Sequence, residues 1–152
     1  MHREDLTSNK VNELLSKMTL EEKIGQMTQI TLEAVSLTKS TKDVDHEIDL
    51  LKLKDAITNH HVGSILNIFE VAHSIDYWHY IIKQIQDLAL TTPNKIPVIF
   101  GIDAIHGASY VLEAALFPQS INMAASFNRA LVRNAARIPS AAGCDAGENT
   151  TQ

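Results

Sequence analysis

The apolar positions in the first part of the chain predict two short helices and a strand. The first helix is predicted over about residues 8–17 by a stripe at helical spacing, formed by Val11, Leu14, Leu15 and Met18. Thr19 and Glu22 make a capping-box sequence, in which each side chain bonds the other residue's amide, so a second helix begins there. We expect Ile24 and Met27 on its buried side. Weak alternation over residues 26–32 indicates a first strand.

The middle of the chain repeats this order of helix and strand. A polar stretch at residues 36–49 is typical of a loop. A helix is then predicted from Asp45 or His46 to about Thr58, with the inward residues Ile48, Leu51 and Ile57. A short buried strand follows over residues 61–66. The most regular helical pattern covers residues 76–90, and its stripe consists of Ile81, Ile82, Ile85, Leu88 and Ala89.

A nearly continuous apolar run at residues 97–102 predicts a strand that is covered on both faces. A final helix is predicted from about Pro118 or Gln119 through Arg137. Such alternation favours an α/β fold with parallel βαβ units, either a small open sheet or part of a larger one. In both cases chemistry belongs at the carboxyl ends of the strands. Asp103 directly follows the strongest strand and is therefore the first candidate site residue.

Composition narrows the class of protein. The chain has 152 residues, the length of one domain, and 45% of them are apolar, which excludes a disordered chain. Thirteen Lys and Arg against eighteen Asp and Glu give a net charge of −5, so we expect no nucleic-acid or membrane partner. No apolar run is long enough to span a bilayer. The first residues lack the apolar segment of a secretory signal, and the sequence leaves the compartment open.

Three further groups of residues invite functional interpretations that we weigh as weaker. The four closely spaced histidines are His60, His61, His73 and His79, but they lack the spacing of a zinc site, so no metal is expected. Tyr77, Trp78 and Tyr80 could stack on a sugar, although ordinary packing is favoured at a helix start. The arginines at helical spacing, Arg129, Arg133 and Arg137, are typical of a solvated helix face.

Three segments in order resemble glycoside hydrolase family 3, and in particular its bacterial β-glucosidases. They are MTLEEKIGQM at 18–27, IPVIFGIDAIHG at 96–107 and LFPQS at 116–120. The resemblance covers about residues 8–135. It implies a (β/α)8 TIM-barrel-like domain that hydrolyses terminal β-linked sugars with retained configuration and without a cofactor.

The resemblance also implies a role for Asp103, which in this family binds sugar hydroxyls in the first subsite. A carboxylate suits that role because it accepts two hydroxyl hydrogen bonds at once. His106 lies three residues further on, beside Gly107. It either bonds Asp103 or a backbone carbonyl in support of the site, or is simply a structural histidine, which is the favoured interpretation.

The departures from the family predict that this chain lacks the catalytic residues. Retaining hydrolysis needs two carboxyl groups about 5–5.5 Å apart. The family supplies its nucleophile from a Ser-Asp-Trp-like motif on a later strand, and residues 138–152 diverge into a loose, polar tail. We therefore expect an incomplete N-terminal portion of the barrel, with about three of its eight strands.

Two consequences follow from an incomplete barrel. Inward residues such as Val98, Phe100 and Ile102, or their neighbours, would lack partners across it. We expect the isolated chain to be inactive, with the remainder of the enzyme as a possible partner. The alternatives are a non-catalytic sugar-binding module and an inert remnant.

Overall fold

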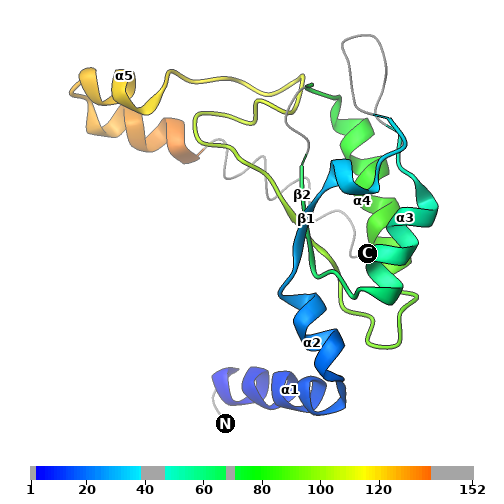
Figure 1. The fold of residues 1–152 in the computed structure, drawn as a ribbon. Helices are drawn as coiled ribbons and strands as arrows, with labels where there is room; N and C mark the ends of the chain where they lie inside the picture. The colour runs from blue at the N-terminus through cyan, green and yellow to red at the C-terminus, as the bar shows by residue number, and fades with distance from the viewer. Residues whose placement is uncertain (1–2, 39–46, 68–70, 138–152) are drawn as a thin grey trace.

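The computed structural model describes residues 3–38, 47–67 and 71–137. Its elements in chain order are α1 (Arg3–Lys17), α2 (Leu20–Gln26), β1 (Gln29–Thr31), the 3-10 helix η1 (Leu32–Val35), α3 (Leu50–Lys54), the π-helix η2 (Asp55–Asn59), β2 (Ser64–Leu66), α4 (Ile75–Ala89), β3 (Ile99–Gly101) and α5 (Ser120–Ala125) (Figure 1). Residues 129–137 are also helical. The predicted tail at 138–152 lies outside the described residues.

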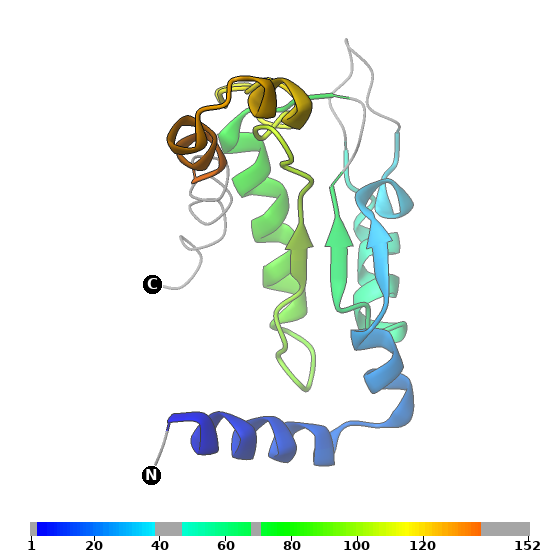
Figure 2. The same ribbon diagram turned by 90° about the vertical axis from the view of Figure 1, so that its left-hand side faces the viewer.

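The strands form one parallel sheet in the order β1-β2-β3. Gln29 pairs with Ser64, and Ser64 with Ile99, so the first residues of the three strands lie side by side in register. Figure 2 shows them pointing the same way, with α3 and α4 along one face of the sheet. The alternation of helices and parallel strands predicted from the sequence is therefore confirmed for the described residues.

The core lies between the sheet and the helices on that face. Its most deeply buried apolar side chains are Leu32, Val35, Leu53, Ile57, Val62, Ile65, Trp78, Ile81, Ile85, Ala89 and Val98. The stripe predicted for α4 is confirmed, with Leu88 partly buried at its margin. Ser74 caps α4 by accepting a hydrogen bond from the Tyr77 amide, which satisfies one of the free N–H groups of the first turn.

Helix α2 begins as predicted but buries a different face. The capping box is present: Thr19 Oγ1 accepts from the Glu22 amide and Glu22 Oε2 from the Thr19 amide, at 3.2 and 2.8 Å. The burial predicted for Ile24 and Met27 is wrong, since both are exposed, Met27 to 80%. Gly25 is buried instead, because its carbonyl accepts from the Gly63 amide at 3.0 Å and the two backbones touch.

Helix α3 is shifted relative to its prediction. Asp49 is its N-cap and accepts from the amides of Leu51 and Lys52. This cap fixes the turn so that Leu53 faces the core while Leu51 is 81% exposed, and the inward placement of Leu51 is therefore wrong. Ile48 and Ile57 are buried as predicted. The predicted helix start at 45–46 lies outside the described residues.

Strand β3 is covered on one face. Val98 and Phe100 pack in the core against the helices, whereas Ile99 between them is 70% exposed. Ile102 is also partly exposed. The prediction of a strand covered on both faces is wrong for the described residues, because no second layer lies over the face that carries Ile99. Val98 and Phe100 thus face the helices, and their neighbour Ile99 is the open position.

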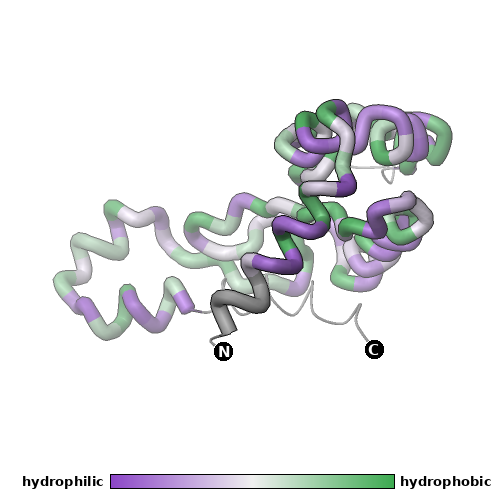
Figure 3. The backbone as a smooth tube through the Cα atoms, turned by 90° about the horizontal axis from the view of Figure 1, so that it is seen from below, coloured by the Kyte–Doolittle hydropathy of each residue, from purple (hydrophilic) through white to green (hydrophobic). Residues whose placement is uncertain are grey.

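The first and last helical segments also expose apolar side chains. Polar and apolar positions alternate along α1 in Figure 3, and Val11 and Leu15 are exposed there. The predicted continuous last helix is broken after α5, where Phe127 has a φ of 51°. Asn128 then caps residues 129–137 by accepting from the Leu131 amide at 3.0 Å. The three arginines of this last helical segment, Arg129, Arg133 and Arg137, are exposed, as predicted.

Candidate functional site

Asp103 lies at the carboxyl edge of the sheet, two residues after β3 ends. Its side chain is exposed. Ile99 and Gly101 belong to the sheet face that α3 and α4 leave open, and Asp103 continues that alternation along the chain. In Figure 2 the segment that follows β3 lies above the strand arrows, at the same end as the chain leaving β1 and β2. The carboxylate is therefore open to a ligand from outside.

His106 contacts the segment at 117–119. Its Nδ1 lies 3.0 Å from the Phe117 carbonyl oxygen, and its Nε2 lies 3.0 Å from Gln119 Nε2. The Phe117 amide also donates to the His106 carbonyl at 2.7 Å. Of the bonds considered from the sequence, the structure thus shows the one to a backbone carbonyl. Gln119, which completes this cluster, was not singled out by the sequence.

The loop after Asp103 is also fastened to the start of α4. Tyr110 O accepts from the His73 amide at 3.0 Å and from Trp78 Nε1 at 2.7 Å. Glu113 Oε2 accepts from the Ile75 amide at 3.1 Å, in the first turn of α4. These partners are 32 to 38 residues apart in the sequence, so local patterns give no indication of them.

The aromatic residues near this loop are mostly structural. Trp78 is buried in the core, with its ring 5.9 Å from Phe100. Tyr77 stacks on the buried His73 at 4.1 Å. Tyr80 is exposed. The packing interpretation of Trp78 and Tyr77 is therefore confirmed.

Asn67 is a further residue that the sequence did not mark. It directly follows β2, and its side chain is fully buried. Among the residues that the structure describes, neither its amide nitrogen nor its oxygen has a hydrogen-bond partner. A buried amide that is left unpaired costs about 1–3 kcal/mol, so we expect Asn67 to oppose the stability of the fold.

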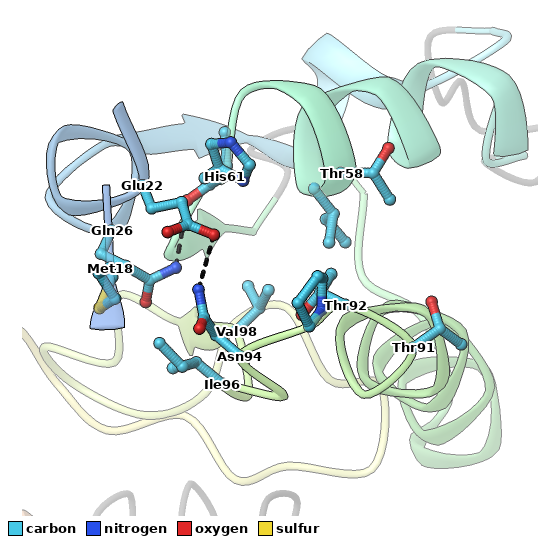
Figure 4. Close-up of a pocket in the computed structure, with 13 residues that line it drawn as sticks. Met18, Glu22, Gln26, Thr58, His61, Thr91, Thr92, Asn94, Ile96 and Val98 are labelled. Atoms are coloured by element: carbon cyan, nitrogen blue, oxygen red, sulfur yellow. Dashed lines mark hydrogen bonds between the residues drawn. The ribbon is translucent and has the colours of Figure 1, made fainter. Parts of the chain in front are cut away.

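The opposite, amino-terminal end of the sheet contains a cavity of about 130 Å³ (Figure 4). Glu22 Oε1 accepts from Asn94 Nδ2 at 2.8 Å, and Gln26 Nε2 donates to the His61 carbonyl at 3.2 Å. These bonds join α2 to the chain before β2 and before β3. The polar groups there hold protein segments together, which makes this cavity a structural feature.

Two exposed carboxyl groups elsewhere in the described residues have a lowered pKa. Lys17 bonds Glu13 and lowers the pKa of that carboxyl group. The pKa of Glu21 is lowered by its own backbone amide and by the Thr19 hydroxyl.

The described residues contain no cluster of three or more possible metal ligands. None of the helices at 3–38, 47–67 and 71–137 is both long and apolar enough to cross a membrane.

Comparison with known proteins identifies the family. The sequence profile of the glycosyl hydrolase family 3 N-terminal domain matches residues 19–151. A lysosomal beta glucosidase of Dictyostelium discoideum is 38% identical over 141 residues, which are 86% of this chain and 16% of that protein. A periplasmic beta-glucosidase of Salmonella typhimurium is 30% identical over 142 residues, 93% of this chain and 15% of that protein. The chain thus spans about a sixth of the length of these relatives. The resemblance seen in the sequence is confirmed, and the chain belongs to glycosyl hydrolase family 3.

Proposed function

We propose that this chain is part of a β-glucosidase-type hydrolase that removes terminal β-linked glucose with retained configuration. Within it, Asp103 binds hydroxyl groups of the glucose ring. The observation that carries this proposal is an exposed carboxylate at the carboxyl edge of a parallel sheet in a family 3 chain. Two relatives named as β-glucosidases support the choice of substrate.

The chemistry of Asp103 fits orientation of the sugar. Hydroxyl groups donate to a carboxylate in charge-assisted hydrogen bonds, and two adjacent hydroxyls can use its two oxygens together. Such a contact fixes the ring relative to the sheet and moves no proton. Water is the only co-substrate of the reaction, and no cofactor is implied. His106 contributes through the backbone turn rather than by touching the sugar.

We place the nucleophile and the acid/base outside these 152 residues. The sequence contains no Ser-Asp-Trp-like motif, and the relatives have much more chain than the part matched here. The open edge of β3 and the exposed Ile99 support a fold in which further strands complete a TIM-barrel-like domain. On this proposal, residues 3–137 supply about three of eight barrel strands.

Binding and turnover measured on the 152-residue chain test the proposal. Saturation-transfer NMR with methyl β-D-glucopyranoside is expected to show binding by the wild type. Asp103→Ala should weaken it roughly 10- to 150-fold, since a hydrogen bond to a charged group contributes about 1.5–3 kcal/mol. The matched control is Asp87→Ala on α4, another exposed aspartate, which should bind as the wild type does.

Four results would contradict the proposal. If the wild type does not bind, or if the Asp103→Ala variant binds normally, the sugar does not bind at this carboxylate. Release of nitrophenol from a nitrophenyl β-glucoside, abolished in Asp103→Ala, would show that the chain holds its own catalytic groups. Binding by a longer family protein containing this chain, without any turnover, would favour a sugar-binding module.

A further inference from the structure

Two stretches of chain cross directly after Asp103. Gly107 has a φ of 120°, and a Cβ atom there would overlap the Ala115 carbonyl oxygen. Beside this crossing, the Phe117 amide donates to the His106 carbonyl at 2.7 Å. The His106 ring returns to the same residue, with Nδ1 at 3.0 Å from the Phe117 oxygen. His106 and Phe117 are thus joined twice and close the loop of residues 107–116.

The partners of the His106 ring specify where its proton lies. A backbone carbonyl only accepts, so Nδ1 must carry the hydrogen that bonds Phe117 O. A carboxamide nitrogen only donates, so the Gln119 Nε2 group, 3.0 Å away, requires a lone pair on Nε2 of the ring. Both contacts are satisfied together only by the neutral Nδ1–H tautomer. Free neutral histidine in water prefers the opposite, Nε2–H form.

We propose that His106 and Gln119 are a positioning pair, in which Gln119 and the Phe117 carbonyl lock His106 in its Nδ1–H tautomer and so hold the turn that carries Asp103. Three residue steps separate Asp103 from His106, a span of at most about 11 Å. We expect a displaced His106 to displace the carboxylate through this short stretch of chain. The effect on sugar binding rests on the function proposed above, whereas the tautomer and the closed loop do not.

The tautomer is measured by the ¹⁵N shifts of the imidazole nitrogens in the 152-residue chain. At a pH where His106 is neutral, the wild type is expected to show a protonated Nδ1 and an unprotonated Nε2. Gln119→Glu places an acceptor opposite Nε2, and the ring should then carry both protons at the same pH. The matched control is Asn122→Asp, which adds the same charge three residues further along and should leave the ring neutral. A predominant Nε2–H form in the wild type, or an unchanged ring in Gln119→Glu, overturns the proposal.

The closed loop is measured by hydrogen exchange of the Phe117 amide. His106→Ala should raise its exchange rate at least tenfold. His106→Asn should restore most of the protection, because its amide nitrogen can replace Nδ1 as donor to Phe117 O. Equal exchange in His106→Ala and the wild type would overturn the positioning role.

Sugar affinity separates this proposal from the proposed function. His106→Ala should bind methyl β-glucoside several-fold more weakly than the wild type, with His106→Asn between the two. Normal binding by His106→Ala contradicts the positioning role alone. A wild type that holds the tautomer and the protected amide but binds no sugar supports the loop and contradicts the proposed function.

Discussion

The two ends of the small sheet use their loops differently. At the amino-terminal end, α2 meets the start of β2 backbone to backbone, and the Glu22 carboxylate is bonded between Thr19 and Asn94. At the carboxyl end, Asp103 is open to solvent. Apolar side chains in the chain that follows Asp103 are exposed as well, namely Ile105, Leu112, Leu116 and Ile121.

On the proposed function, this difference separates stability from binding, as is general for barrels built of parallel strands. At the amino-terminal end, the side chains of Glu22 and Gln26 form hydrogen bonds with segments that are far apart in sequence. At the carboxyl end, the Asp103 carboxylate is exposed. The loop that follows it is held in place by hydrogen bonds of Trp78, Glu113 and His106. Changes at the first end should therefore affect folding, and changes to Asp103 should affect ligand binding.

The largest effect on stability is expected for Gly63→Ala. The new Cβ atom would overlap the carbonyl oxygen of Gln26, and backbone atoms cannot move aside as a flexible side chain can. We expect a loss of about 3 kcal/mol in the free energy of unfolding, measured by urea denaturation. Gly101→Ala is the control, because the nearest atom to its Cβ would be the end of the flexible Leu66 side chain, at 3.2 Å, and no backbone atom lies closer than 3.8 Å. An equal loss in both variants would show that the close backbone contact between Gly63 and Gln26 has no special role in stability.

A smaller loss is expected when the tie between α4 and the carboxyl-end loop is cut. Trp78→Phe keeps an aromatic ring in the core but removes the bond from Nε1 to the Tyr110 carbonyl. We expect a loss of about 2 kcal/mol from the hydrogen bond and the smaller ring. Tyr80→Phe on the same helix is exposed and should change stability by less than about 0.5 kcal/mol. If thermal melting shows no difference between the two variants, the hydrogen bond from Trp78 to the Tyr110 carbonyl contributes nothing to stability.

Asn67→Leu should have the opposite sign. It replaces a fully buried, unpaired amide by an apolar side chain of similar size, which removes a desolvation cost. We expect a gain of about 1 kcal/mol in the free energy of unfolding. A pronounced loss would show that the amide supports the fold.

An effect of similar size is expected for the coupling between Glu22 and Asn94. A double-mutant cycle of Glu22→Ala and Asn94→Ala should give roughly 0.5–1.5 kcal/mol for their hydrogen bond. The neighbouring Glu21 makes no bond to Asn94 and provides the reference cycle, for which we expect a coupling near zero. A coupling that is equal in both cycles would mean that the contact in Figure 4 does not join the two segments.

The sequence predicted those features that depend on neighbours along the chain. The capping box at Thr19 and the stripe of α4 are local patterns, and both are present. Leu51 was misplaced because the turn of α3 is set by the Asp49 cap rather than by apolar spacing alone. The open face of β3 was missed because a run of apolar residues does not reveal which layers cover a strand.

The same distinction applies to the candidate site. Asp103 was singled out as a candidate because the end of a parallel strand can be located from its own residues, and its sugar-binding role stays a prediction. Glu113 and Gln119 were not found, since their partners lie 38 and 13 residues away and are brought together only by the fold. Nothing in the local pattern of either residue indicates those contacts.

Mapping the sugar onto the structure tests the central claim most directly. The ¹⁵N-labelled chain is titrated with methyl β-D-glucopyranoside, and the amide shifts are followed at both ends of the sheet. We predict that the amides of residues 101–107 move with the sugar concentration, while those around Glu22, Gly63 and Asn94 stay still. Shifts confined to the amino-terminal end, with the amide of Asp103 unmoved, would contradict the assignment of binding to the carboxyl edge.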